Sequence, residues 1–420
     1  MDEREVHTPL KNILIIASLY GSKRVLGLAR YLPEFGWSPT IITPPVSWQP
    51  TIISSSKPEI DGVRIIETGY GSLKDPLLRV GQRLNRAPNR IMGKLLHFGG
   101  AILNYPDSYS GWRKFALQAA ITEIENNNVQ AIMSICPVTS HIVAGKLKER
   151  YGVLWVADFP DLWSQNYNYS YGPIRRMMDH NLEKKTMRNV DIITTPTPKI
   201  DRLGKLHRNK PIHTITLGYN HEEYAVEVAT TKKFTITYTG LIYAGKQYPQ
   251  KVLHALSDLI RRRFISRSDC EVRFYGPYMD WLSTYVNELG LSDIVQQYAT
   301  VCHEAIVKIQ KESQVLLLLD WDDLREYGAY TAKVFEYIGA NRPVLATGGM
   351  HGNAISDLLK QTNAGVHATS YEEICRGLLQ YYREYKQEGL VVSRGTLRNQ
   401  YSYYEMARKY DLLLSGKPLN

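Results

Sequence analysis

Glu336 is a charged residue in a stretch that otherwise looks built for burial, TAKVFEYIGANRPVLATGG (331–349). Thr331 is a residue type that caps helices, and Pro343 limits the helix after it to about residue 340. Free amides in the first turn carry partial positive charge, which suits a phosphate. Glu336 lies about 6–7 Å further along the axis at ~1.5 Å per residue, the separation of a nucleotide's diphosphate and ribose. The helix could hold a nucleoside diphosphate at two points, although a glutamate that faces solvent or an arginine fits equally well.

A second stretch, YTGLIYAGKQYPQKVLHAL (238–256), could contact the same diphosphate. It predicts a strand, a turn at Gly240 and then a helix, and glycine lets the backbone approach a ligand closely. Lys246 directly follows Gly245 and could neutralise phosphate charge. Many strand-to-helix loops contain both residue types, so this pair alone does not identify a site.

These residues must be positioned by parallel sheets, because short β-branched runs alternate with helical patterns along the whole chain. The expected strands of the first half are 12–18, 39–44, 129–135, 153–159, 190–196 and 212–217. Those of the second half are 234–240, 271–276, 295–301, 315–320, 343–347 and 364–368. Continuous apolar runs suit strands covered on both faces. We expect an α/β fold with two doubly wound, Rossmann-like domains that bind ligands beyond the carboxyl ends of their strands.

The boundary between the domains is expected near residues 218–233, where the sequence becomes polar and loses its period. We assign residues 1–218 to an amino-terminal domain and residues 219–395 to a carboxyl-terminal one. The last segment, 396–420, has a helical pattern and could pack back on the first domain. A helix that caps the second domain is the alternative.

Composition limits the classes of protein. The chain has 420 residues, 44% of them hydrophobic, which is enough for two packed domains. No stretch reaches the ~18 uninterrupted apolar residues of a membrane helix, and the charged start lacks an apolar leader, so we expect a cytoplasmic protein. The cysteines show no C-x-x-C spacing and are expected to be reduced: Cys136, Cys270, Cys302 and Cys375. A net charge of +10 favours an anionic partner, which could be nucleic acid, a phosphorylated substrate or a membrane surface.

The two stretches around Glu336 and Lys246 together resemble the nucleotide-sugar half of the retaining family-four glycosyltransferases of GT-B fold. Stretches of the first domain are similar to the acceptor half of a branch that builds surface polysaccharides and glycolipids: 24–43, 105–112 and 134–163. The resemblance covers most of the chain in the expected order. It implies a retaining hexosyltransferase that moves a sugar from a nucleoside-diphosphate sugar to a glycan or lipid-linked acceptor, with no cofactor. A non-catalytic sugar-nucleotide or glycan-binding protein is the alternative.

The resemblance implies particular contacts to the donor. Glu336 would bind the ribose as the second glutamate of the family's E-x7-E pattern, Lys246 would face the diphosphate, and Gly21 would belong to the glycine loop beneath the donor. The other expected donor-binding positions are Gly240, Ala329, Tyr330 and Thr331. Gly328 replaces the first glutamate, and Leu241 stands in place of the family's usual arginine. These departures leave the identity of the donor sugar open.

On the acceptor side, the resemblance implies that His141 faces the reacting sugar, where a neutral imidazole could hydrogen-bond a hydroxyl. Helix capping or packing is nearly as good an interpretation. In DFPDLW (158–163), Asp161 is preferred over Asp158 as the carboxylate that orients the acceptor, and His141, Asp161 and Lys246 form the expected catalytic set. DWDD (320–323) resembles the metal-binding D-x-D of a different glycosyltransferase fold, but no metal is expected because the helix dipole and Lys246 can balance the diphosphate charge.

Residues 75–100, DPLLRVGQRLNRAPNRIMGKLLHFGG, combine a basic stripe with an apolar one. This combination suits an anionic leaflet, so we expect a protein that lies peripherally on the inner face of the cell membrane. A helix pair packed on its own domain is the alternative. Nucleic acid is not expected as a partner, because the acceptor side of a sugar-transfer site gives no reason for it.

Overall fold

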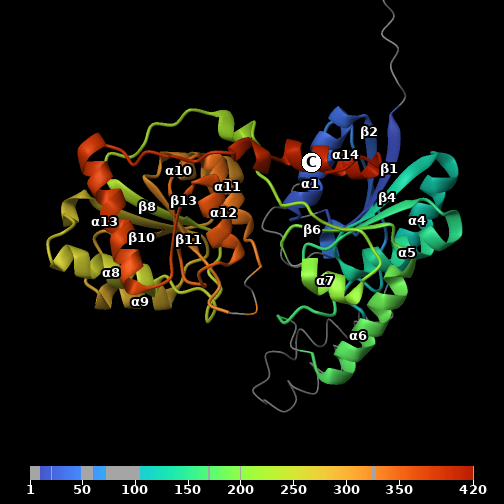
Figure 1. Cartoon of the computed structure of the whole chain (residues 1–420), viewed down its shortest axis with the longest axis horizontal. Helices are drawn as coiled ribbons and strands as arrows, with labels where there is room; N and C mark the ends of the chain where they lie inside the picture. Colours follow the sequence, from blue (N-terminus) through green and yellow to red (C-terminus); the bar gives the residue numbers. More distant parts are fainter. Residues whose placement is uncertain are drawn as a thin grey trace, which may run out of the picture. The chain divides into compact units, whose positions relative to one another are not determined.

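The computed structural model describes residues 10–19, 21–48, 60–71, 105–168, 171–198, 200–323, 325 and 328–419 (Figure 1). The chain divides into two compact units. Unit 1 comprises described residues within Met1–Ile215 and Ala407–Asn420, and unit 2 comprises those within Thr216–Met406. The sequence predicts the boundary between residues 218 and 219, whereas the two units divide between Ile215 and Thr216.

Unit 1 is built on a seven-stranded parallel sheet in the order β3-β2-β1-β4-β5-β6-β7. Its strands are β1 (Lys11–Ile16), β2 (Trp37–Thr43), β3 (Arg64–Glu67), β4 (Val129–Ser134), β5 (Leu154–Asp158), β6 (Ile192–Thr195) and β7 (Ile212–Thr214). Its helices include α1 (Lys23–Tyr31), α4 (Arg113–Asn126), α5 (Val138–Tyr151), α6 (Pro173–Thr186) and α7 (Ile200–Leu206).

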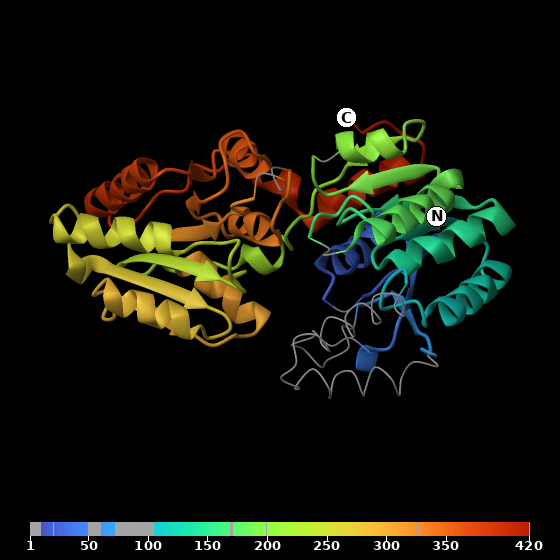
Figure 2. The same cartoon turned by 90° about the horizontal axis from the view of Figure 1, so that it is seen from below.

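Unit 2 has a six-stranded parallel sheet in the order β10-β9-β8-β11-β12-β13. Its strands are β8 (Phe234–Thr239), β9 (Cys270–Tyr275), β10 (Val295–Tyr298), β11 (Val315–Leu319), β12 (Val344–Thr347) and β13 (Gly365–Ala368). Its helices are α8 (Gln250–Arg261), α9 (Asp280–Glu288), α10 (His303–Glu312), α11 (Ala332–Ala340), α12 (Ala354–Thr362) and α13 (Tyr371–Glu388). Helices lie on both faces of each sheet (Figures 1 and 2).

The apolar runs of the sequence explain this layering. Every residue of β11 is buried, as are four consecutive residues of β1 and all of β12. A strand with no polar face must be covered on both sides, which in a parallel sheet is done by the crossover helices. The predicted α/β class with two Rossmann-like, doubly wound sheets is confirmed.

The end of the chain packs on unit 1. After a short 3-10 helix (Arg398–Tyr401), α14 (Tyr403–Leu414) brings Tyr410 to the carboxyl ends of β5 and β6. The Tyr410 hydroxyl donates to Asp158 Oδ1 (2.8 Å) and lies 2.9 Å from Thr194 Oγ1. Arg24 of α1 completes the cluster through bonds of 2.6 and 2.9 Å to the Asp158 carboxylate. These buried contacts fix the carboxyl-terminal helix to the sheet of unit 1.

Across the described residues, no helix combines the length and apolar content needed to cross a bilayer. The basic and apolar stripes predicted for residues 75–100 lie outside the described residues, so peripheral membrane attachment through them stays a prediction.

Candidate functional site

The sheet of unit 2 has its topological switch point at β8 and β11. The chain passes from β8 to β9 and β10 on one side, and from β11 to β12 and β13 on the other. The loops after β8 and β11 therefore diverge at the carboxyl edge of the sheet, which is where doubly wound sheets bind ligands. Gly240 and Lys246 follow β8, whereas residues 328–331 follow β11 and lead into α11. The topology thus brings together the two stretches singled out from the sequence.

Gly240 directly follows β8 and leaves space for the side chain of a lysine. Its φ is +113°, in the region that favours glycine, and its amide donates to the carbonyl of Tyr275 at 2.7 Å. A Cβ added at Gly240 would lie 2.5 Å from Cε of Lys333. The Lys333 amine lies 5.5 Å from the centroid of the Tyr238 ring, in β8. The positive charge of Lys333 therefore lies at the carboxyl end of β8.

Lys333 was not predicted from the sequence, although a signal was present. It occupies the second position of α11, where the partial positive charge of the helix terminus disfavours a cation. A lysine in a first turn is explained if an anion also lies there. Its position across Gly240 could not be predicted from the sequence, because residues 240 and 333 are 93 positions apart in the chain.

The first turn of α11 is left without a side-chain cap. Thr331 is the residue before the helix, as predicted, and has an extended conformation, but its side chain makes no capping hydrogen bond. Its hydroxyl is buried and finds no hydrogen-bond partner among the described residues. Ala329 and Tyr330 are half-buried just before it, and the Tyr330 ring packs edge-on against Phe335 at 5.4 Å. The first amides of a helix have no partner one turn back within it, so the end that carries Lys333 has the partial positive charge of a helix amino terminus.

Glu336 lies one turn further along α11 and is 7% exposed. Its Oε2 accepts from Nε2 of Gln310 at 3.3 Å, and the same amide nitrogen donates to Oγ1 of Thr239 at 3.0 Å. Tyr224 donates its hydroxyl to Gln310 Oε1 at 2.6 Å. Burial, and after it the charge of Glu336, raise the pKa of Tyr224, which keeps the phenol protonated. Glu336 therefore does not face solvent. The side-chain amide of Gln310 links it to Thr239, the residue before Gly240.

Lys246 lies against the loop that follows β11. Its amine is 4.5 Å from the centroid of the Trp321 ring, which also packs against Tyr243 at 5.3 Å. Gln247 donates from its side chain to the carbonyl of Leu319 at 2.7 Å and so ties the loop after β8 to the end of β11. Lys246 is held at the predicted edge of the sheet, and its contact with a diphosphate stays a prediction.

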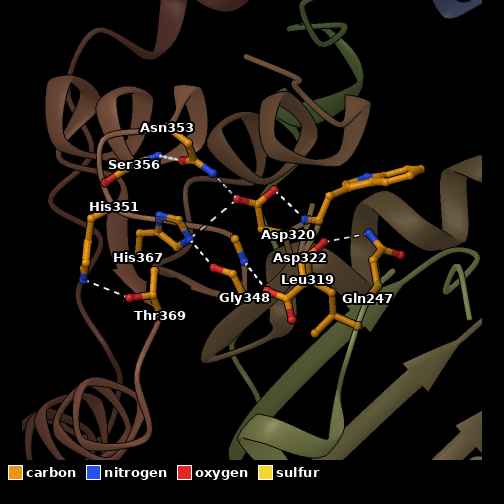
Figure 3. A network of polar contacts seen from close by, with 12 residues as sticks. Gln247, Leu319, Asp320, Asp322, Gly348, His351, Asn353, Ser356, His367 and Thr369 are labelled. Carbon is orange, nitrogen blue, oxygen red and sulfur yellow. Dashed lines mark hydrogen bonds and ion pairs between the residues drawn. The ribbon is translucent and has the colours of Figure 1, made fainter. Parts of the chain in front are cut away.

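Two of the three carboxylates of DWDD, those of Asp320 and Asp322, are engaged by the loop after β12 (Figure 3), and Asp323 pairs with Arg325. Asp320 accepts from Asn353 Nδ2 at 2.6 Å, and its Oδ2 lies 3.6 Å from Nε2 of His367. Asp322 accepts from the amide of Gly349 at 2.7 Å. Burial raises the pKa of Asp320. Within the described part of the chain, no three His, Cys, Asp or Glu side chains form a group that could hold a metal ion.

In unit 1, His141 is buried in α5. Its Nδ1 lies 2.8 Å from Oγ of Ser134, which also accepts from Nε1 of Trp155 at 2.8 Å. Since the indole can only donate, we assign the hydroxyl hydrogen to the bond with Nδ1, which leaves the proton of the neutral ring on Nε2. The ring stacks on Phe159 at 4.6 Å, and burial lowers the pKa of His141 to about 4. The side chain is neutral and packed, and its contact with an acceptor stays a prediction.

Two further residues of unit 1 were predicted to contact substrate. Asp161 is exposed in the loop after β5, whereas Asp158 is fully buried in its pair with Arg24. Asp158 therefore serves the packing of α1 and α14, which agrees with the preference for Asp161. Gly21 follows β1 with a φ of +79°. The catalytic role of Asp161 and the donor contact of Gly21 stay predictions.

No family model and no curated protein sequence matches the chain. Solved structures resemble it over nearly the whole length. Sucrose-phosphate synthase from Thermosynechococcus elongatus gives a TM-score of 0.59 at 13% identity, covering 97% of this chain and 98% of that one. A trehalose-6-phosphate protein from E. coli, bound with UDP-2-fluoro glucose, gives 0.60 at 10% identity, covering 96% and 99%. The fold is GT-B.

The GT-B fold alone does not decide the reaction. The UDP-GlcNAc 2-epimerase from Methanocaldococcus jannaschii resembles the chain with a TM-score of 0.51 at 10% identity, covering 96% of this chain and 100% of that one. The similar proteins thus include a synthase and an epimerase on one architecture. On this fold, the residues of the site determine which reaction takes place.

Proposed function

We propose that the protein is a glycosyltransferase that binds a nucleoside-diphosphate sugar in unit 2 and transfers the sugar to a hydroxyl group. The observation that carries this proposal is the position of Lys333 across Gly240, beside the uncapped first turn of α11. A cation and the amino-terminal end of a helix thus lie together at the switch of the sheet. A diphosphate is the ligand group that both would stabilise.

Glu336 supplies the second contact of the proposed donor. A carboxylate accepts several hydrogen bonds, so Glu336, which accepts from Gln310, would also accept from the hydroxyls of a ribose. The spacing along α11 places this group about one helical turn beyond the diphosphate. The bound UDP-2-fluoro glucose of the similar E. coli protein supports a UDP-sugar as the donor here.

The proposed chemistry is electrostatic. The bond between the sugar carbon and the diphosphate oxygen breaks, a bond between that carbon and the acceptor oxygen forms, and the hydroxyl proton would pass to the leaving diphosphate. The charge that develops on the diphosphate would be stabilised by Lys333, Lys246 and the amides of α11. Asp161 would orient the acceptor hydroxyl from unit 1. The resemblance to the retaining family-four enzymes supports retention, independence from metals and other cofactors, and a role in surface polysaccharide or glycolipid synthesis in the cytoplasm at the inner face of the membrane.

Calorimetric titration with UDP and an assay of UDP release from UDP-sugars test the proposal together. Glu336→Gln should weaken UDP binding by about tenfold, because one acceptor of a ribose hydroxyl becomes a donor. Lys333→Gln should lower the rate of UDP release more than UDP affinity, since the cation acts most strongly on the developing charge. Lys360→Gln, at an exposed position of α12, is the matched control and should behave as wild type.

Two results would separate the alternatives. UDP binding that is unaffected in both Glu336→Gln and Lys333→Gln would refute the site. UDP binding that depends on both residues, with no UDP release from any donor in the presence of glycan and lipid acceptors, would favour a sugar-nucleotide-binding protein without turnover.

A further inference from the structure

A buried amide lies between Glu336 and the segment that connects β7 to β8. Gln310, on α10, is 0% exposed. Its Oε1 accepts from the hydroxyl of Tyr224 at 2.6 Å, and its Nε2 donates to Oε2 of Glu336 at 3.3 Å and to Oγ1 of Thr239 at 3.0 Å. A side-chain amide has two N–H donors and one carbonyl acceptor. The oxygen and both donors of the Gln310 amide therefore all have partners inside the protein.

Tyr224 and Glu336 together decide which way this amide points. Burial raises the pKa of Tyr224, so its hydroxyl keeps the hydrogen that it donates to Gln310. If the amide were turned over, its oxygen would face the Glu336 carboxylate, and two acceptors in a buried site repel each other. In the observed orientation, every contact of the amide joins a donor to an acceptor.

Tyr224 is itself held in place by its surroundings. It lies in a short 3-10 helix (Glu223–Ala225) and is 2% exposed. Its ring packs edge-on against the ring of Tyr219 at 5.5 Å, and its carbonyl accepts from the amine of Lys311 at 2.9 Å. The hydroxyl therefore reaches Gln310 from a position that packing and a second hydrogen bond define.

These contacts determine where the Glu336 carboxylate lies. A glutamate has three side-chain torsions and can place its carboxylate in several ways. The hydrogen bond from Gln310 holds one carboxylate oxygen near Thr239, the last residue of β8. A carboxylate that is oriented before a ligand arrives loses less conformational entropy on binding.

We propose that Gln310 is a positioning residue for the donor, and that Tyr224 holds it in the orientation that turns the Glu336 carboxylate toward the ribose. The inference rests on the proposed function, because Glu336 is the contact through which both residues act. It extends that function by giving the segment between β7 and β8, which contains Tyr224, a part in the recognition of the donor.

Calorimetric titration with UDP, 2′-deoxy-UDP and 3′-deoxy-UDP tests the inference. The readout is the preference for UDP over the deoxy nucleotide that binds more weakly, because this ratio reports the ribose contact and not the stability of the protein. Wild type should prefer UDP by about tenfold, since that is the value of one hydrogen bond from a hydroxyl to a carboxylate. Equal binding of the three nucleotides to wild type would overturn the inference.

Two variants remove the proposed positioning. Tyr224→Phe deletes the donor that orients Gln310, and Gln310→Met deletes the amide but keeps a side chain of similar length. Both should reduce the preference for UDP to about twofold. Should Gln310→Met fail to fold, Tyr224→Phe decides the question by itself. A wild-type preference in Tyr224→Phe would overturn the inference.

Tyr385→Phe is the matched control. The hydroxyl of Tyr385, on α13, also donates at 2.6 Å to a carbonyl, that of Lys232. The control variant thus loses a hydrogen bond of the same kind and length from unit 2, and it should keep the wild-type preference for UDP. A control that loses the preference as far as Tyr224→Phe does would show that general destabilisation, and not positioning, causes the effect.

Glu336→Gln separates this inference from the proposed function. Combined with Glu336→Gln, Tyr224→Phe should cause no further change in preference, because a positioning residue acts only through the carboxylate. If Glu336→Gln and Lys333→Gln weaken UDP binding while Tyr224→Phe keeps the full preference, the donor site stands and the positioning role is refuted. UDP binding that is unaffected in both Glu336→Gln and Lys333→Gln would refute the donor site and this inference with it.

Discussion

Acidification should destabilise unit 1 in part through the side chain of His141. The ring is 3% exposed, its Nδ1 is occupied by Ser134, and burial lowers its pKa from 6.5 to about 4. Protonation of Nδ1 would turn it into a donor that faces the hydroxyl hydrogen of Ser134. It would also bury a positive charge in the ring that stacks on Phe159. The folded state therefore excludes a proton that the unfolded chain accepts.

The sign and size follow from the two pKa values. Above pH 6.5 both states are neutral and the stability contributed by the neutral ring is fully present. As the pH falls from 6.5 to about 4, the unfolded chain takes up the proton first, and this stability is lost. The full shift corresponds to about 3 kcal/mol, and about 2 kcal/mol of it is lost between about pH 7 and about pH 5.

Chemical denaturation of wild type and His141→Asn at these two pH values measures the effect. Asparagine retains an acceptor for Ser134 but does not titrate in this range, and every other ionisable group is common to both proteins. The wild type should lose about 2 kcal/mol more than the variant on acidification. Equal losses in the two proteins would refute a depressed pKa of His141, and with it the neutral tautomer assigned from Ser134 and Trp155.

Two further predictions concern the glycine at the donor site and the buried ion pair of unit 1. Gly240→Ala should displace Lys333 and weaken UDP binding in calorimetry. Gly245 also has a positive φ, but a Cβ added there would meet no atom within 4 Å, so Gly245→Ala should only strain the backbone by about 1–2 kcal/mol. Equal UDP affinities of the two variants would rule out the contact at position 240. Asp158→Asn should lower the free energy of unfolding by about 3–5 kcal/mol, because it leaves the charge of Arg24 buried without its partner. The double variant Arg24→Met, Asp158→Leu should be more stable than Asp158→Asn in the same denaturation assay, and a less stable double variant would show that the pair itself, rather than the stranded charge, carries the effect.

The sequence alone determined the class of the fold and the start of the helix that carries Glu336. Uninterrupted apolar runs such as Val315–Leu319 require cover on two faces, and their alternation with helical patterns leaves a doubly wound sheet as the natural solution. These are local properties, because period and turn chemistry act over a few residues. The predicted side-chain cap by Thr331 failed for the same reason: local propensity fixes where a helix begins, but the surroundings decide where a hydroxyl points.

The tertiary structure decided which side chains meet. Strand order places Lys333 across Gly240 and pairs Arg24 with Asp158 at a separation of 134 residues. It also decided that His141 is enclosed and neutral. Burial and charge pairing are sums over neighbours that are distant in sequence, and a period read along one segment carries no information about which distant segment lies beside it.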